Sequence, residues 1–245
     1  MDFYCVQEMT HGVALAEYVA GGISEFAELM NKKAEELGLK DTHFVTPHGL
    51  DEEEHFTTAY ELAKITDYAL KNEEFEKIVK TKSYTVNING NFKNINNTNE
   101  LLGYVKGVYG VKTGFTNGAN RCLVTSIRRG DMDAICVVLG ADTKKLRGAD
   151  SIKLIEYAFA NFQMIDIGFM IHDNFDNLCD ISKFNIYKGV SNDLKIDLEK
   201  SDISLYPVNK EDVKDVRVEV EIKKDLIAPI QKNDVIRKND SKNRR

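Results

Sequence analysis

Tryptophan is absent from the 245-residue sequence, proline occurs only three times, and no apolar run reaches the length of a membrane-spanning helix. Such a helix needs about 18 uninterrupted apolar residues, so none is expected. Basic residues are not in excess either, because the formal net charge is -6 at pH 7 and the isoelectric point is near 5.5. Nucleic acid is therefore not expected as a partner, since its phosphates attract basic surfaces.

The first residues also lack the features of a secretory leader. Met1–Cys5 contain neither a basic segment nor an apolar run, so we expect no signal peptide in this chain. The composition is that of a globular protein, because 42% of the residues are hydrophobic and can form a buried core. The length suggests one large domain, or a medium domain followed by a small one.

Cysteine is scarce, and the positions of its four residues do not favour pairing. The cysteines are Cys5, Cys122, Cys136 and Cys179. Two of them, Cys122 and Cys136, fall in apolar runs that we expect to form a hairpin around Gly130-Asp131. A two-residue loop would place Cys136 opposite Thr125. Neither this register nor that of a three-residue loop brings the two Cα atoms within the ~7 Å that a disulfide allows. We expect buried free thiols, which argues weakly against an oxidising compartment.

Residues 1–163 show patterns of both helix and strand, which together predict an α+β domain with an antiparallel sheet covered by helices. Helical spacing covers residues 13–20, 24–37, 58–70, about 72–79 and 146–162. Thr58 and Glu61 form a capping-box pattern at the start of the third helix. Residues 83–88 and 91–95 predict two strands joined by Asn89-Gly90, which is typical of a type I′ turn. A strand carrying Lys112 and the hairpin of residues 121–141 follow.

The pattern changes after residue 163 to short β-like runs. They cover residues 164–171, 183–189, 194–198, 203–208 and 213–222. We expect residues 164–236 to form a small all-β domain. Residues 237–245 are polar and basic, and we expect them to be disordered.

The most informative segment is Val108–Thr116, a predicted strand that contains Lys112, Thr113 and Gly114. At the edge of an antiparallel sheet, the backbone of such residues can pair with an extended acyl ligand. Lys112 would hold a carboxylate or a developing anion, and the Thr113 hydroxyl can donate to the same group. Gly114 permits close approach because it has no Cβ. The segment suits a peptide that ends in a free carboxylate.

Three segments together carry a resemblance to a known family. Gly110–Val124, Thr42–Asp51 with its His-Gly-Leu-Asp sequence, and the helix start Phe56–Ala63 resemble the serine-type D-alanyl-D-alanine carboxypeptidases, the low-molecular-mass penicillin-binding proteins. The β-rich region of residues 164–230 is similar to the family's C-terminal domain. The resemblance covers most of residues 13–230.

The resemblance implies a penicillin-binding and β-lactamase-like transpeptidase domain with three active-site elements. These are a Ser-x-x-Lys on a helix, whose serine is acylated by the substrate, a Ser-x-Asn on a loop, and the Lys-Thr-Gly strand. None of the nine serines in this sequence is followed three residues later by lysine. They are Ser24, Ser83, Ser126, Ser151, Ser182, Ser191, Ser201, Ser204 and Ser241. Ser241-Lys242-Asn243 fits the loop element only by chance, in the polar tail. Gln7-Glu8-Met9 stand where that element is expected.

We therefore expect residues 1–163 to be a partial carboxypeptidase domain that lacks its N-terminal part, followed by the β-rich domain and the tail. The expected substrate-binding residues are Lys112, Thr113 and Gly114, and we expect no catalytic residue, metal or cofactor in this chain. The implied reaction removes the terminal D-alanine of a peptidoglycan stem pentapeptide ending in D-Ala-D-Ala. Without the nucleophile, we expect the rate of this reaction to fall by a factor on the order of 10⁴ or more. β-Lactams would bind covalently only if the nucleophile were restored.

The family also implies a location outside the cytoplasm, in the cell envelope, and association with the membrane. Residues 234–240 have no wide apolar face, so we expect no amphipathic anchor in this chain.

Two other functions stay open at this point. One is a non-catalytic homologue that binds peptidoglycan or regulates its processing, and the other is a relative of class A β-lactamases. The β-rich region argues against the second. A metal site at His43, His48 and His55 is disfavoured, because their spacing fits no common zinc pattern. A surface loop whose histidines make local hydrogen bonds is the favoured interpretation.

Overall fold

The computed structural model describes residues 3–181, 185–189, 196, 198, 204–219 and 225–231. The chain divides into two compact units, Met1–Ala160 and Asn161–Arg245.

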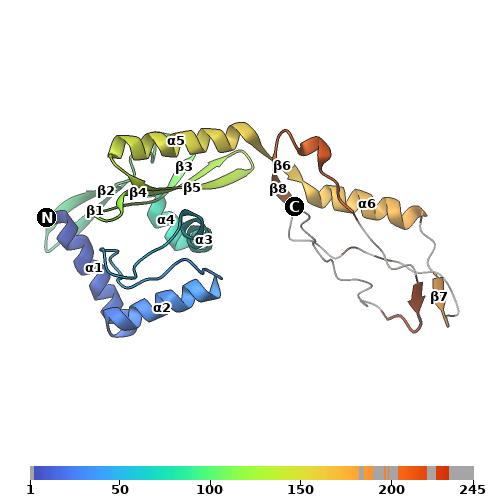
Figure 1. Cartoon of the computed structure of the whole chain (residues 1–245), viewed down its shortest axis with the longest axis horizontal. Coiled ribbons are helices and arrows are strands. Elements are labelled where there is room, and N and C mark those ends of the chain that lie inside the picture. The colour runs from blue at the N-terminus through green and yellow to red at the C-terminus, as the bar shows by residue number, and fades with distance from the viewer. Residues whose placement is uncertain are drawn as a thin grey trace. The chain divides into compact units, whose positions relative to one another are not determined.

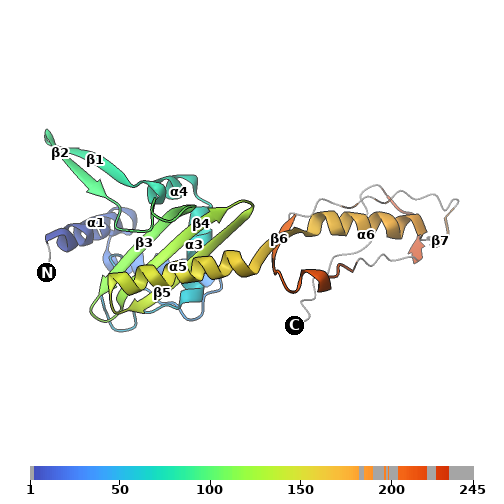
Figure 2. The ribbon, with the colours of Figure 1, turned by 90° about the horizontal axis from the view of Figure 1, so that it is seen from above.

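The first unit is a three-stranded antiparallel sheet with helices on both faces (Figures 1 and 2). The strands, in the order β3-β4-β5, are β3 (Val108–Thr116), β4 (Asn120–Arg129) and β5 (Met132–Ala141). Helix α5 (Lys144–Asn161) covers one face, and α3 (Ala59–Leu70) and α4 (Glu73–Lys80) lie against the other. Helices α1 (Phe3–Ala20) and α2 (Ile23–Glu36) precede them. The predicted α+β class is confirmed.

Helix α1 begins earlier than the apolar pattern from Val13 predicted. Its first helical residue is Phe3, so Gln7, Glu8 and Met9 lie in a helix. These three residues stand where the resemblance places the Ser-x-Asn loop, and in this chain they are helical.

The core of the first unit lies between the sheet and α5. Its buried residues are Leu101, Val108, Leu123, Ile127, Cys136 and Ile155. Leu123 and Ile127 are fully buried on the central strand and lie four residues apart, so they face the same side of the sheet. Ile155 meets them from α5.

Both predicted hairpins are confirmed. The smaller one pairs β1 (Ser83–Ile88) with β2 (Asn91–Asn96), and Asn89 and Gly90 have φ angles of 52° and 85°, as a type I′ turn requires.

In the larger hairpin, Arg129 lies opposite Met132, so the loop has two residues. Thr125 lies opposite Cys136, which is the register of the two-residue alternative. An irregularity between Arg121 and Leu123 takes Cys122 out of register. Both thiols of this hairpin are free.

The capping box at α3 is only half formed. The Thr58 hydroxyl accepts a hydrogen bond from the Glu61 N–H at 3.2 Å. The Glu61 carboxylate does not return to Thr58 but accepts from the N–H groups of Lys40 and Asp41, at 2.8 and 3.0 Å. Because these backbone donors belong to a turn remote in sequence, tertiary contacts replaced the local partner that the motif predicts.

The second unit contains helix as well as strand. Its elements are β6 (Phe162–Asp166), α6 (Ile167–Ile181), β7 (Asn185–Tyr187), β8 (Leu205–Asn209), a 3₁₀ turn (Val213–Asp215) and β9 (Asp225–Ile227). Strand β6 pairs antiparallel with β8, and β7 pairs parallel with β9.

The prediction of a strand over residues 164–171 is wrong from Ile167 onward. The Asp166 carboxylate accepts a hydrogen bond from the Phe169 N–H at 2.8 Å, which caps the first turn of α6. Apolar spacing in so short a run fits helix and strand equally. Residues 213–215 likewise form a 3₁₀ turn instead of a strand. The predicted strand at 194–198 lies largely outside the described residues, and the predicted tail of 237–245 lies wholly outside them.

No helix within the described part of the chain is both long enough and apolar enough to cross a membrane.

An ion pair joins α5 to the segment before β3. The Arg147 side chain is 4% exposed, and its Nη2 lies 2.8 and 2.6 Å from the two carboxylate oxygens of Glu100. Arg147 Nη1 also lies 3.5 Å from the Cys122 carbonyl oxygen. The pair therefore ties the helix both to β4 and to the approach to β3.

We predict that Glu100→Gln lowers the free energy of unfolding by about 1–3 kcal/mol, because it leaves the buried Arg147 guanidinium without its counterion. The value lies below that of a fully buried pair, since the Glu100 side chain is 39% exposed. Denaturant unfolding measures the change. The matched control is Asp150→Asn, which breaks the exposed pair with Lys153 and should cost less than about 0.5 kcal/mol. Equal effects of the two variants would contradict the prediction.

Candidate functional site

Strand β3, which contains Lys112, Thr113 and Gly114, lies at an edge of its sheet. It pairs with β4 on one side, and no strand of the described chain pairs with its other side. An edge strand presents free N–H and C=O groups to an extended ligand. The geometry thus fits the predicted strand position of these three residues.

Lys112 is exposed, and its Nζ donates to the carbonyl oxygen of Thr113 at 2.8 Å. This local contact satisfies one of the three ammonium donors and leaves the others available to an anion. The Thr113 hydroxyl oxygen lies 2.6 Å from that of Thr98, a residue that the sequence patterns did not single out.

The two glycines of β3 differ in what the fold requires of them. A Cβ on Gly110 would lie 3.1 Å from Val79 Cγ2, so close packing against α4 favours glycine there. A Cβ on Gly114 would meet only the Cys122 Cβ, at 3.6 Å, which is an ordinary van der Waals distance. Internal packing therefore gives no reason for glycine at position 114.

A short asparagine-rich loop supports β3 from the side of the preceding hairpin. Asn99 is buried, donates through Nδ2 to the Gly110 carbonyl oxygen at 2.9 Å, and accepts from the Leu101 N–H at 3.1 Å. Asn97 donates to the carbonyl oxygens of Val79 and Thr81, at 3.2 and 3.1 Å. These bonds fix the loop that carries Thr98 against both α4 and β3.

Asp51 connects the His-Gly-Leu-Asp loop to the end of β3. Its Oδ1 accepts from the Thr116 hydroxyl at 2.5 Å, and its Oδ2 accepts from the Gly118 N–H at 3.0 Å. A Cβ on Gly118 would lie 3.0 Å from Asp51 Oδ1, so glycine lets the carboxylate approach. The structure thus brings together two segments that sequence reasoning linked only by resemblance.

The hydrogen bond from the Thr116 hydroxyl, with the one from the Gly118 N–H, holds the pKa of Asp51 below its ordinary value. The smaller loss of hydration in the loop opposes this shift but does not cancel it. Asp51 therefore stays ionised, and keeps both bonds, at any pH above its ordinary carboxylate range.

The three histidines of this loop make local hydrogen bonds, as the favoured interpretation predicted. His43 Nδ1 lies 2.7 Å from the Glu54 carbonyl oxygen, and His48 Nδ1 lies 3.3 Å from the Leu50 nitrogen. His55 Nδ1 accepts from the backbone N–H of Val45, at 2.9 Å. Across the residues that the structure describes, no group of His, Cys, Asp and Glu has the arrangement of a metal site.

Burial lowers the pKa of His55, and the nearby His43 and His48 lower it further, against the opposing charges of Asp51 and Glu52. Because Nδ1 serves as a hydrogen-bond acceptor, it must be unprotonated in the folded loop.

Two of the described serines are fully buried inside the fold. Ser151 on α5 donates to the Arg147 carbonyl oxygen at 2.8 Å, and Ser126 lies in the central strand. Ser241 lies outside the described residues. The geometry gives neither buried serine a place at the β3 edge, which agrees with the absence of Ser-x-x-Lys from the sequence.

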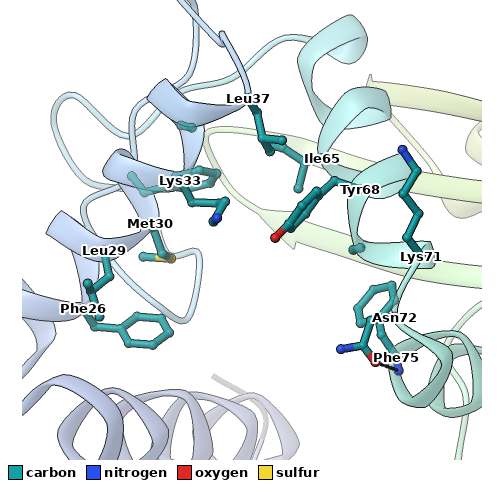
Figure 3. A pocket seen from close by; sticks show the side chains of 13 residues that line it. Phe26, Leu29, Met30, Lys33, Leu37, Ile65, Tyr68, Lys71, Asn72 and Phe75 are labelled. Atoms are coloured by element: carbon teal, nitrogen blue, oxygen red, sulfur yellow. Dashed lines mark hydrogen bonds between the residues drawn. The ribbon is translucent and has the colours of Figure 1, made fainter. Parts of the chain in front are cut away.

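A second feature is an apolar cavity of about 720 Å³ between α2, α3 and α4 (Figure 3). Phe26, Met30, Ile65 and Phe75 are among its lining side chains. Lys33 also lines it, with Nζ 5.2 Å from the centre of the Tyr68 ring. No residue of β3 contributes to its wall.

Comparison with known proteins gives a family match over the first unit. The family model described as D-alanyl-D-alanine carboxypeptidase matches residues 8–143. D-alanyl-D-alanine carboxypeptidase DacF of Bacillus subtilis is 43% identical over 152 residues, which cover 62% of this chain and 39% of the relative. DacD of Escherichia coli is 40% identical over 156 residues, which cover 63% of this chain and 39% of the relative. The chain thus spans about two fifths of these relatives.

Two solved structures match across both units. Penicillin binding protein 5 from Haemophilus influenzae has a TM-score of 0.69 and 31% identity, covering 91% of this chain and 62% of that one. Penicillin binding protein 6B from Escherichia coli has a TM-score of 0.65 and 31% identity, covering 86% of this chain and 57% of that one.

We predict that Asp51→Ala accelerates hydrogen exchange at the Gly118 amide, because that N–H loses its acceptor. Asp51→Asn should have a smaller effect, since the carboxamide retains one acceptor oxygen. The matched control is Glu53→Ala, which removes an exposed acid of the same loop. The measurement is the exchange rate of the Gly118 amide, followed by NMR in each folded variant. If Glu53→Ala accelerated exchange as much as Asp51→Ala, the assigned contact would be wrong.

We also predict that stability falls as the pH drops below about 6.5, the ordinary histidine pKa. The folded state has a lowered His55 pKa, so the unfolded chain binds the proton more readily and acid favours unfolding. His55→Asn should flatten this dependence, because the amide oxygen replaces Nδ1 as acceptor without titrating. Unfolding free energies at pH 7 and pH 5 test it, with His172→Asn on the exposed surface of α6 as control. If the unfolding free energy of His55→Asn changed with pH as much as that of the wild type, His55 would not be the cause of the pH dependence.

Proposed function

Because the chain belongs to the D-alanyl-D-alanine carboxypeptidase family, we propose that the free edge of β3 binds the C-terminal end of a peptidoglycan stem peptide ending in D-Ala-D-Ala. The observation that carries this proposal is the position of Lys112, Thr113 and Gly114 on an edge strand. Strand β3 pairs with β4 on one side and with no described strand on the other. The relatives named above are carboxypeptidases of this substrate class by name.

Each of the three residues has a distinct role in this proposal. Lys112 exchanges its contact with the Thr113 carbonyl oxygen for the terminal carboxylate of the peptide. The Thr113 hydroxyl donates to the same carboxylate, and charge-assisted bonds of this kind are worth about 1.5–3 kcal/mol. The backbone of Gly114 pairs with the peptide, and no side chain of its own keeps the ligand away.

We further propose that this 245-residue chain does not form an acyl-enzyme by itself. The support is chemical, because no serine in the sequence has lysine three residues later to assist proton transfer. A chain that binds the peptide without cleaving it would act as a peptidoglycan-binding homologue, which is the second candidate function. Covalent capture of β-lactams would then require a nucleophile supplied from elsewhere.

The location and the domain division belong to the same proposal. A peptidoglycan ligand implies action outside the cytoplasm, in the cell envelope. We propose a partial catalytic domain over residues 1–163 and a C-terminal domain over residues 164–236. The division into compact units next to this boundary supports it.

The test is binding of an N-acetylated Lys-D-Ala-D-Ala peptide, measured by NMR titration or calorimetry. Lys112→Ala should weaken binding about tenfold or more, because the carboxylate loses its cation. Lys145→Ala, which removes an exposed lysine on α5, should leave binding unchanged. Equal loss in both variants would show that the binding is unspecific attraction to positive charge. Covalent labelling of the wild-type chain by a fluorescent penicillin would refute the claim that it is not acylated.

A further inference from the structure

Thr98 makes a direct side-chain contact with Thr113 of the proposed carboxylate site. It lies in the loop between β2 and β3, and its Oγ1 is 2.6 Å from Thr113 Oγ1. Thr98 has the polar side chains Asn97 and Asn99 on either side, and both bind backbone groups of neighbouring elements. Its position relative to β3 is therefore set by the fold and not by Thr113 alone.

A hydrogen bond between two hydroxyls has two possible directions. If Thr113 donates to Thr98, the single proton of Thr113 is used within the protein and cannot reach a ligand. If Thr98 donates to Thr113, the Thr113 proton is free to point outward. An anion at the β3 edge stabilises only the second direction, because the first presents it with an oxygen lone pair.

We propose that Thr98 is a positioning residue that donates to Thr113, so that Thr113 donates to the terminal carboxylate of a peptide bound along β3. This inference rests on the proposed function, and it extends the site to a residue outside the Lys-Thr-Gly strand. Hydrogen bonds in such a chain polarise one another, so the Thr113 hydroxyl becomes a stronger donor when it also accepts from Thr98.

The arrangement also predicts selectivity for an acid over an amide. Lys112 attracts the carboxylate through its charge. The two hydroxyls fix the direction of the hydrogen bond to it, since Thr98 limits the rotation of the Thr113 side chain. A charged acceptor gains roughly twice as much as a neutral one from a well-aligned donor. Loss of Thr98 should therefore reduce binding of a carboxylate more than binding of its amide.

The first experiment measures affinities for N-acetylated Lys-D-Ala-D-Ala and for its C-terminal amide. Thr98→Val keeps the side-chain shape without the hydroxyl, and we expect it to weaken binding of the acid by about five- to twentyfold and of the amide by less than about twofold. Thr98→Ser restores the hydroxyl and should bind the acid within about twofold of the wild type. Unchanged affinity of Thr98→Val for the acid, or equal loss for both peptides, would overturn the inference.

The second experiment needs no peptide and separates this inference from the proposed function. Three-bond NMR couplings of Thr113 report whether its side chain holds one χ1 rotamer. We expect a single rotamer in the wild type and in Thr98→Ser, and averaged couplings in Thr98→Val and Thr98→Ala. Averaged couplings in the wild type would overturn the positioning role. A wild type with a fixed rotamer that binds neither peptide would instead refute the proposed function and leave the positioning role supported.

Discussion

The central strand β4 is the element on which the first unit depends. It pairs with β3 on one edge and β5 on the other, and its fully buried residues include Leu123, Thr125, Ser126 and Ile127. A strand buried on both faces and paired on both edges has no surface left for a ligand. The proposed binding therefore falls to a neighbouring strand, and β3 is the neighbour that carries Lys112 and Thr113 at an edge without a strand partner in the described chain. Helix α5 packs on one face of the sheet, and α3 and α4 pack on the other.

Side-chain to backbone bonds give order to the irregular segments around this edge. The loop that contains Asp51 has little regular structure of its own, so His55 and Glu61 satisfy backbone donors that a helix or sheet would otherwise satisfy. Asp51 then acts in the same way on the turn after β3. Asp51 thereby joins two polar segments that are far apart in sequence, through hydrogen bonds to a carboxylate that is ionised at neutral pH.

The sequence patterns predicted the features whose causes are local. Asn89-Gly90 specifies its turn through positive φ angles, Thr58 caps a helix that begins beside it, and the apolar runs on either side of Gly130-Asp131 predict a hairpin. Features that arise from distant contacts were not predictable in this way. Thr98 and Asn99 belong to a polar stretch without periodicity, and only the folded chain shows that they meet β3. The helix after Asp166 was missed because an apolar run of that length fits either structure until its cap is known.

The contrast between Gly110 and Gly114 has an evolutionary consequence. At position 110, an added methyl group would press on Val79, so a change there affects folding first. At position 114, a methyl group would find ordinary space, and the backbone there does not adopt the left-handed conformation that favours glycine. If β3 binds a ligand as proposed, homologous chains with a side chain at position 114 are expected to have lost that binding. Chains with a side chain at position 110 are instead expected to have changed the packing of α4.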